Sequence, residues 1–256
     1  MEITPLEAFD DNYIWLLRQG DIVVVVDPGD EDPVLEFLAQ EGLKLAAILI
    51  THKHGDHTGG VEALLAKYPE IPVYGPTNET ASGVNQKVAD GDEVRIEGLD
   101  ATFQVMDVPG HTEGHVAYYG EGVLFCGDTL FAAGCGRVFT GTHQQLHDSL
   151  QRIAALPPQT LCYCAHEYTI DNLGFAKWVE PESAAIQQRD QQAKAMRSEG
   201  KPTVPSSLAL ELETNPFLRT DQTAVIQAAE NYAGQKLQSG AEVFTAVRTW
   251  KDKAYD

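Results

Sequence analysis

The segment from Ile50 to Gly60 constrains this chain more than any other part of its sequence. It runs Ile-Thr-His-Lys-His-Gly-Asp-His-Thr-Gly-Gly, and it offers borderline divalent metals a group of nitrogen and oxygen donors: His52, His54, Asp56 and His57. The apolar run from Leu45 leads into this segment and Gly59-Gly60 ends it, which predicts a buried strand that stops in a loop. Where such a strand ends in a loop, alternate side chains point in different directions, so we expect two ligand sets that face two different ions. A histidine tag or a solvated loop would not supply a strand, a carboxylate and a glycine turn in this order.

The acidic composition limits the partners of the chain. Of its 256 residues 43% are hydrophobic, and 38 acidic against 18 basic side chains give a formal net charge of −20. That field repels polyanions, so we expect no nucleic-acid partner, and an anionic substrate requires a local basic patch. No apolar run is long enough to cross a bilayer, and the N-terminal residues lack the features of a secretory signal. We expect a cytoplasmic monomer without a membrane partner.

The cysteines form neither a metal motif nor a redox motif. None of Cys126, Cys135, Cys162 and Cys164 belongs to a C-x-x-C pair. Cys162 and Cys164 share one face of a predicted strand, where burial as small apolar groups is the expected state. Reduced thiols fit a cytoplasmic protein.

Strand and helix patterns alternate along the first two thirds of the chain. The predicted elements are strand 22–26, helix 33–43, strand 45–51, helix 60–68, short strands between 88 and 127, helix 144–156 and strand 161–165. This order indicates an α/β fold with two sheets packed between outer helices. The strand pattern then fades, and helices are predicted at 182–199, 222–235 and 240–253. We therefore predict one domain over residues 1–170 and a mostly helical domain over residues 171–256.

Three further donors stand where predicted strands or turns end. His111 follows a Pro-Gly turn, Asp128 ends an apolar strand, and His166 ends the strand at 161–165. A rigid sheet edge preorganises such donors. The resulting sets are His52, His54 and His111 for one ion and Asp56, His57 and His166 for the other, with Asp128 shared. A shared carboxylate supplies the anion that two dications about 3.5–4 Å apart require.

The other histidines have simpler interpretations. His115 is expected in the core or beside a ligand. His143 and His147 are four residues apart on a polar helix, and we expect both on its solvated face.

Several motifs together resemble the metallo-β-lactamase superfamily. They are Thr-His-x-His-x-Asp-His from Thr51, Gly-His-Thr-x-Gly-His from Gly110, Cys-Gly-Asp-Thr from Cys126 and Ala-His-Glu-Tyr from Ala165. More specific segments are similar to glyoxalase II, the hydroxyacylglutathione hydrolase family, and to its bacterial members. These are Asp10-Asp-Asn-Tyr-Ile-Trp15, Val26-Asp-Pro-Gly-Asp30, Gly134-Cys-Gly-Arg-Val-Phe139, His166-Glu-Tyr-Thr-Ile170 and Asn215-Pro-Phe-Leu-Arg219. The similarity runs from end to end of the chain.

The resemblance implies both a fold and a reaction. The fold is the αβ/βα sandwich as the catalytic domain, with the helical region at 171–256 as the substrate-binding domain. The reaction is hydrolysis of the thioester S-lactoylglutathione to D-lactate and glutathione, the last step of methylglyoxal detoxification. Two divalent ions, zinc first and iron or manganese as alternatives, would supply a bridging hydroxide, with Asp56 orienting it and Asp128 bridging the ions.

The same resemblance implies a glutathione site at Arg137, Phe139, Tyr168, Arg248 and Lys251. Many eukaryotic members have lysine and tyrosine where this chain has Arg137 and Phe139. Arginine keeps the charge, whereas phenylalanine lacks the hydroxyl. An ordinary solvated helix face is the alternative interpretation of Arg248 and Lys251.

Other functions remain open at this point. A phosphodiesterase or RNA-processing nuclease of the same fold is disfavoured by the net charge of −20. An iron-dependent redox enzyme is disfavoured by the full set of donors, because a mononuclear centre needs fewer. A metal-dependent binding protein without activity would be expected to have lost at least one donor.

Overall fold

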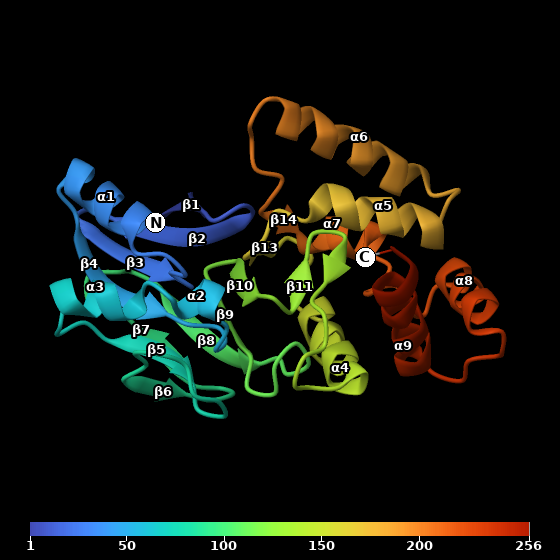
Figure 1. Ribbon diagram of the computed structural model, residues 1–256, viewed down its shortest axis with the longest axis horizontal. Helices are drawn as coiled ribbons and strands as arrows, with labels where there is room; N and C mark the ends of the chain where they lie inside the picture. The colour runs from blue at the N-terminus through green and yellow to red at the C-terminus, as the bar shows by residue number, and fades with distance from the viewer. Residues whose placement is uncertain (256) are drawn as a thin grey trace. The chain divides into compact units, whose positions relative to one another are not determined.

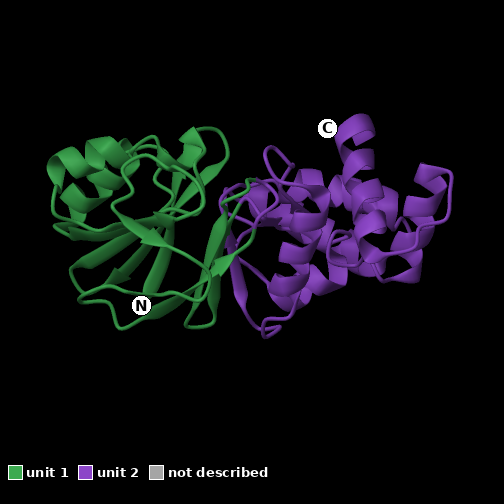
Figure 2. Cartoon of the chain, turned by 90° about the horizontal axis from the view of Figure 1, so that it is seen from below, with its two compact units in different colours: residues 1–108, 112–127 green, residues 109–111, 128–256 purple. Residues whose placement is uncertain are grey.

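The structure is a computed structural model that describes residues 1–255, and these residues form two compact units (Figure 2). Unit 1 comprises residues 1–108 and 112–127. Unit 2 comprises residues 109–111 and the chain from residue 128 onward. The predicted division into domains 1–170 and 171–256 stays a prediction.

The first sheet of unit 1 has the strand order β1-β2-β3-β4-β5-β6 (Figure 1). Its strands are β1 Glu2–Ala8, β2 Asn12–Gln19, β3 Ile22–Val26, β4 Lys44–Leu49, β5 Val73–Pro76 and β6 Gln86–Val88. The sheet is mixed, because β1 to β3 pair antiparallel and β3 to β6 pair parallel. Val23 to Val26 of β3 are all buried, as a β-branched run in a sheet covered on both faces predicts.

A second layer of strands and several helices complete unit 1. The strands lie in the order β10-β9-β8-β7. Their bounds are β7 Glu93–Arg95, β8 Thr102–Asp107, β9 Val116–Gly120 and β10 Val123–Gly127, and the helices are α1 Asp32–Glu41, α2 Gly55–Thr58 and α3 Val61–Lys67. Leu38 of α1 and Leu64 of α3 share one buried apolar cluster with Val25 of β3 and Ile48 of β4. These two helices therefore pack on the first sheet.

Unit 2 is mostly helical. Its elements are β11 Leu130–Phe131, β12 Gly134–Cys135, α4 His143–Ala154, β13 Leu161–Cys164, α5 Thr169–Val179, α6 Ala184–Ser198, β14 Ser206–Ser207, α7 Leu208–Thr214, α8 Thr223–Ala233, α9 Gly240–Trp250 and the π-helical turn η1 Lys251–Tyr255. β11 and β12 form a tight hairpin, and β13 pairs antiparallel with β14. Leu173 of α5 and Ile186 of α6 lie in a common buried cluster.

The helices predicted from periodicity are confirmed. Those expected at 33–43, 60–68, 144–156, 182–199, 222–235 and 240–253 are present as α1, α3, α4, α6, α8 and α9. Within residues 1–255, no helix combines the length and the apolar character that crossing a membrane requires.

Candidate metal centre

The histidine-rich segment of unit 1 follows β4 directly and turns into the short helix α2. His52 and His57 have no exposed surface, while the side chain of Asp56 is 43% exposed. The Nε2 atom of His52 lies 3.0 Å from Nδ1 of His54. The strand end thus brings these two imidazole nitrogens close together.

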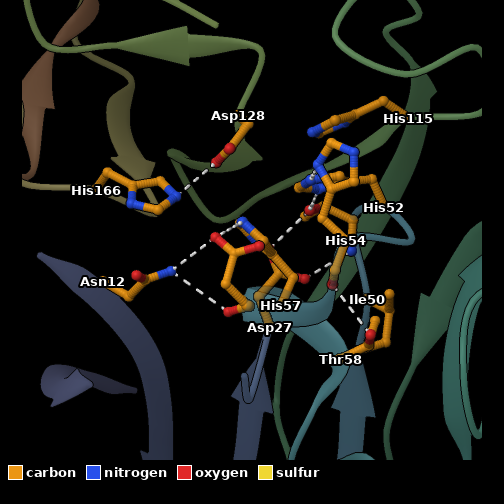
Figure 3. Close-up of polar contacts among 12 residues, drawn as sticks. Asn12, Asp27, Ile50, His52, His54, His57, Thr58, His115, Asp128 and His166 are labelled. Atoms are coloured by element: carbon orange, nitrogen blue, oxygen red, sulfur yellow. Dashed lines mark hydrogen bonds and ion pairs between the residues drawn. The ribbon is translucent and has the colours of Figure 1, made fainter. Parts of the chain in front are cut away.

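A buried carboxylate behind this loop, Asp27, fixes the tautomers of His52 and His57 (Figure 3). Its Oδ1 accepts the Thr51 backbone N–H at 2.8 Å, and its Oδ2 accepts the Thr51 hydroxyl at 2.7 Å. Nδ1 of His57 lies 3.0 Å from the same Oδ2, so the ring proton must be on Nδ1. Because the Thr51 hydroxyl hydrogen is directed to Asp27, the Thr51 oxygen accepts from Nδ1 of His52 at 3.1 Å. Both Nε2 atoms therefore keep the lone pair that a metal ligand needs.

The sequence prediction did not include Asp27 as a functional residue. Asp27 is the first residue after β3 and has a φ of +53°, a left-handed conformation that is uncommon outside glycine. The position of this carboxylate at the end of a buried strand is the sequence feature that could have identified Asp27. Its two oxygens accept hydrogen bonds from Thr51 and His57, so it orients the imidazole of a candidate ligand.

Asp56 is held in place from β2 and from the loop after β3. The Asn12 amide Nδ2 lies 3.3 Å from the Asp56 carboxylate, and the Asp56 Oδ2 lies 3.4 Å from Nε2 of His57. Gly29 packs so closely that a Cβ atom there would meet the Asp56 carbonyl oxygen at 1.9 Å. The glycine of the Asp27-Pro-Gly turn is therefore required for this close approach.

Two further residues of unit 1 support the histidine loop. The His115 ring is 1% exposed and stacks on His52 with centroids 4.6 Å apart, so it is a buried group beside a candidate ligand. The Glu79 carboxylate accepts the backbone N–H of Lys53 at 2.8 Å and that of Gly114 at 3.3 Å. Glu79 therefore ties the backbone between His52 and His54 to the loop that carries His115, and sequence reasoning did not identify it.

The donors predicted in unit 2 also lie together. His111, Asp128 and His166 are buried, and the two oxygens of the Asp128 carboxylate face different rings. Oδ2 lies 3.6 Å from Nε2 of His111. Oδ1 lies 3.4 Å from Nε2 of His166 (Figure 3). Nδ1 of His111 donates to the Arg137 carbonyl oxygen at 2.8 Å, so its Nε2 is also the nitrogen with the lone pair.

Three of the residues predicted to bind glutathione lie beside these donors. Phe139 is 63% exposed, and its ring meets that of His111 edge to face at 5.1 Å. The Tyr168 ring stacks on His166 with centroids 4.8 Å apart. Arg137 is exposed in the segment that follows β12, and its carbonyl oxygen accepts a hydrogen bond from the His111 ring. A ligand held by these three side chains would therefore contact the donor groups of unit 2.

The other two predicted residues, Arg248 and Lys251, are almost fully buried. Arg248 is 1% exposed, donates to the Cys135 carbonyl oxygen at 3.1 Å and pairs with Asp252 at 2.8 Å. Lys251 is 5% exposed, and its Nζ lies 3.4 Å from an Asp171 carboxylate oxygen. Neither residue belongs to an ordinary solvated helix face.

The cysteines are buried, as predicted, and are poor nucleophiles. Burial raises the pKa of the Cys135 thiol to about 11 and that of Cys164 to about 12. Burial also raises the pKa of Cys162. Neutral thiols neither attack carbonyls efficiently nor bind metals without losing a proton.

The prediction of a solvated face for His143 and His147 is wrong. Both rings pack against Phe244 of α9, and the side chain of His147 is only 12% exposed. Helix α9 covers this side of α4, and burial lowers the pKa of His143.

The donor chemistry fits divalent metal ions. In unit 1, ring nitrogens of His52 and His57 lie within 4.8 Å of each other and of a carboxylate oxygen of Asp27, the residue that orients these rings. In unit 2, a carboxylate stands between two imidazoles whose Nε2 atoms face it. Neutral imidazole and carboxylate donors without thiolates suit zinc, iron and manganese.

The fold and these donors define a class of metal-dependent protein. Residues 9–166 match the family model described as the metallo-beta-lactamase superfamily. The crystal structure of ETHE1 from Myxococcus xanthus superposes with a TM-score of 0.69 at 26% identity, covering 100% of this chain and 96% of that one.

Proteins that are similar to this chain over its full length identify the family within this superfamily. Residues 167–254 match the model described as the hydroxyacylglutathione hydrolase C-terminus. The hydroxyacylglutathione hydrolase of Alkalilimnicola ehrlichii is 52% identical over 255 residues, which cover 99% of each chain. That of Nitrosomonas europaea is 48% identical over 252 residues, 98% of this chain and 96% of the relative. The chain therefore belongs to the hydroxyacylglutathione hydrolase family.

Proposed function

We propose that this protein hydrolyses the thioester of S-(2-hydroxyacyl)glutathione, with S-lactoylglutathione as the main substrate and D-lactate and glutathione as products. The observation that carries the proposal is the likeness to hydroxyacylglutathione hydrolases over 98–99% of the chain, including the C-terminal region. The superfamily fold alone would not choose the reaction, because one fold supports many chemistries.

We propose that the seven predicted donors hold two divalent ions, with zinc as the expected metal. His52, His54 and His111 would hold one ion and Asp56, His57 and His166 the other. Asp128 would bridge them, because its two carboxylate oxygens already face different imidazoles. When bound, such ions lower the pKa of water to about 7 and polarise a carbonyl oxygen.

The residues of the chain prepare the site for that chemistry. Asp27 keeps the Nε2 lone pair of His57 available directly, and that of His52 through Thr51. Asn12 restrains the Asp56 carboxylate, which accepts a hydrogen bond and so can orient the attacking water. A thiolate is a good leaving group, so no strong general acid is required. The buried, neutral Cys135 is not a nucleophile for this reaction.

The glutathione moiety carries net negative charge and needs cations in a protein of net charge −20. Arg137 is exposed beside His111 and offers a bidentate guanidinium. Phe139 and Tyr168 offer ring faces and edges on either side of the Asp128 carboxylate. Arg248 would act from its buried position by fixing the Cys135 carbonyl, two residues before Arg137. Lys251 would contribute charge, while a monomeric state and a cytoplasmic location stay predictions.

A direct activity assay tests the proposal. The purified, metal-loaded protein is expected to remove the thioester absorbance of S-lactoylglutathione with release of D-lactate. Hydrolysis of a phosphodiester such as bis(p-nitrophenyl) phosphate is measured in parallel to test the nuclease alternative. Activity should disappear after chelation and return with zinc. Turnover of the phosphodiester without turnover of the thioester would overturn the proposal.

A further inference from the structure

The hairpin β11–β12 connects two parts of the proposed site. Asp128 lies two residues before β11, and Arg137 lies two residues after β12. The turn between the strands contains Ala133 with a φ of +57°, a conformation that an alanine does not adopt without support. The position of this turn therefore bears on the carboxylate at one end and on the guanidinium at the other.

The carboxylate of Glu211 in α7 supplies that support. Glu211 has no exposed surface, and its Oε2 accepts the backbone N–H of Ala133 at 2.8 Å. The buried Asn215, at the end of α7, places its amide nitrogen 2.9 Å from the Gly134 carbonyl oxygen and 3.2 Å from that of Phe131. The same amide lies 3.1 Å from Glu211 Oε2, so both side chains act on the turn as one group.

The other oxygen of Glu211 is held by residues away from the hairpin. Oε1 accepts a hydrogen bond from the guanidinium of Arg189 in α6 and another from the Ser206 hydroxyl at 2.5 Å. Arg189 is itself buried and also donates to the Thr214 hydroxyl. A buried ion pair of this kind is weak support for net stability, because desolvation offsets the attraction between the charges. Its fixed geometry, by contrast, determines which oxygen of Glu211 is available to the turn.

We infer that Glu211, oriented by Arg189, is a positioning residue for the reaction proposed above. It acts on Asp128 and Arg137 through the β11–β12 turn and touches neither metal nor substrate. The inference rests on the proposed function for its kinetic part. Its metal-binding part does not depend on which substrate the protein hydrolyses.

The substitution Glu211→Gln tests this role. A glutamine must direct its Oε1 to the Arg189 guanidinium, which leaves its NH₂ group facing the Ala133 N–H, so the turn loses its acceptor. We expect zinc affinity to fall by about tenfold, the scale seen for groups that orient ligands. We also expect the KM for S-lactoylglutathione to rise by a similar factor.

Two further variants separate positioning from general destabilisation. In Arg189→Gln/Glu211→Gln the two introduced amides can pair with each other, so the amide oxygen at position 211 can return to the Ala133 N–H. Zinc affinity should then recover most of its loss, and KM should fall back toward the wild-type value. Glu180→Gln is the control, because Glu180 is 6% exposed and forms a bidentate pair with Arg219 at 2.9 Å in the same unit. It should lower the melting temperature and leave zinc affinity and KM unchanged.

The outcomes are distinct when all variants are assayed as full-length protein below their melting temperatures. An equal loss of zinc affinity and an equal rise in KM in Glu211→Gln and Glu180→Gln would overturn the inference, as would a double variant no better than Glu211→Gln. If the wild-type protein fails to hydrolyse the thioester, the proposed function fails, and the zinc titrations still decide the role of Glu211.

Discussion

The substitution Asp27→Asn is expected to weaken metal binding without touching any proposed ligand directly. In the wild-type protein both carboxylate oxygens act as acceptors, for the Thr51 N–H at 2.8 Å, the Thr51 hydroxyl at 2.7 Å and His57 Nδ1 at 3.0 Å. An asparagine can keep its oxygen on the Thr51 N–H. Its NH₂ group then faces the Thr51 hydroxyl and His57 as a donor.

The consequence is a change of tautomer at two imidazoles. His57 Nδ1 must accept, which moves its ring proton to Nε2. The Thr51 hydroxyl, no longer donating to Asp27, turns its hydrogen toward His52 Nδ1 at 3.1 Å, and the same shift follows in that ring. Loss of an orienting partner costs about 10–100-fold in metal affinity, or about 1.4–2.8 kcal/mol. We expect the upper end of this range for Asp27→Asn, because two rings are affected.

Zinc titration of the apo protein against a chromophoric chelator measures the effect. Thr51→Val removes the acceptor of His52 alone and should lose about tenfold in affinity. Thr51→Ser keeps the hydroxyl and is the matched control, with affinity near that of the wild type. Circular dichroism at the assay temperature verifies that each variant is folded. Wild-type zinc affinity in Asp27→Asn would refute the tautomer argument.

Four further predictions concern the site and its supports. Asp128→Ala should lose metal and activity together, and a fully metallated, active variant by metal analysis contradicts a bridging role. Lys251→Met should raise KM by roughly tenfold, the worth of one charge-assisted hydrogen bond, with kcat within about twofold of the wild-type value. The control is Lys253→Met, because Lys253 is exposed, and equal KM values in the two variants would exclude Lys251 from substrate binding. Gly114→Ala places a methyl 2.7 Å from Glu79 Cγ and 2.9 Å from the backbone carbonyl carbon of Asn78, so it should cost about 1–3 kcal/mol in thermal unfolding, and an unchanged melting temperature argues against these contacts. Burial raises the pKa of the Cys135 thiol from 9.0 to about 11, so the thiol stays neutral at pH 8. The stability that the neutral thiol contributes is therefore present below pH 9 and lost as the pH rises toward 11. Rapid labelling of Cys135 by iodoacetamide in the native protein at pH 8 would contradict this.

Much of the fold could be predicted from the sequence because its patterns are local. The apolar run of β3 and the helical spacing of apolar residues in α1, α3 and α8 lie within a few consecutive residues, so they can be recognised without knowing the rest of the fold. The hairpin of β1 and β2 was not predicted, since β1 is only partly buried and lacks a regular apolar alternation, although the apolar run from Tyr13 to Leu17 in β2 is a strand signal. Helix α5 was also missed, because its apolar residues lie all around the helix and leave no amphipathic stripe.

The candidate metal donors stand out in the sequence for a different reason. Imidazole and carboxylate groups at strand ends have few structural uses, so their chemistry is visible in the sequence. The groups that orient them could not be found in this way. Asp27, Glu79 and Glu211 act on partners 24, 26 and 78 residues away in sequence, and each resembles an ordinary acidic residue until the fold is known. Burial of His147 was likewise decided by α9, which follows much later in the chain.

The central claim is that imidazoles and carboxylates from distant parts of the chain hold a pair of metal ions. Anomalous diffraction from crystals of the zinc-loaded protein, measured on both sides of the zinc edge, tests it most directly. We predict two zinc peaks, one bound by His52, His54 and His111 and the other by Asp56, His57 and His166, with Asp128 between them. A single peak at full zinc loading, or peaks bound by other residues, would contradict the account.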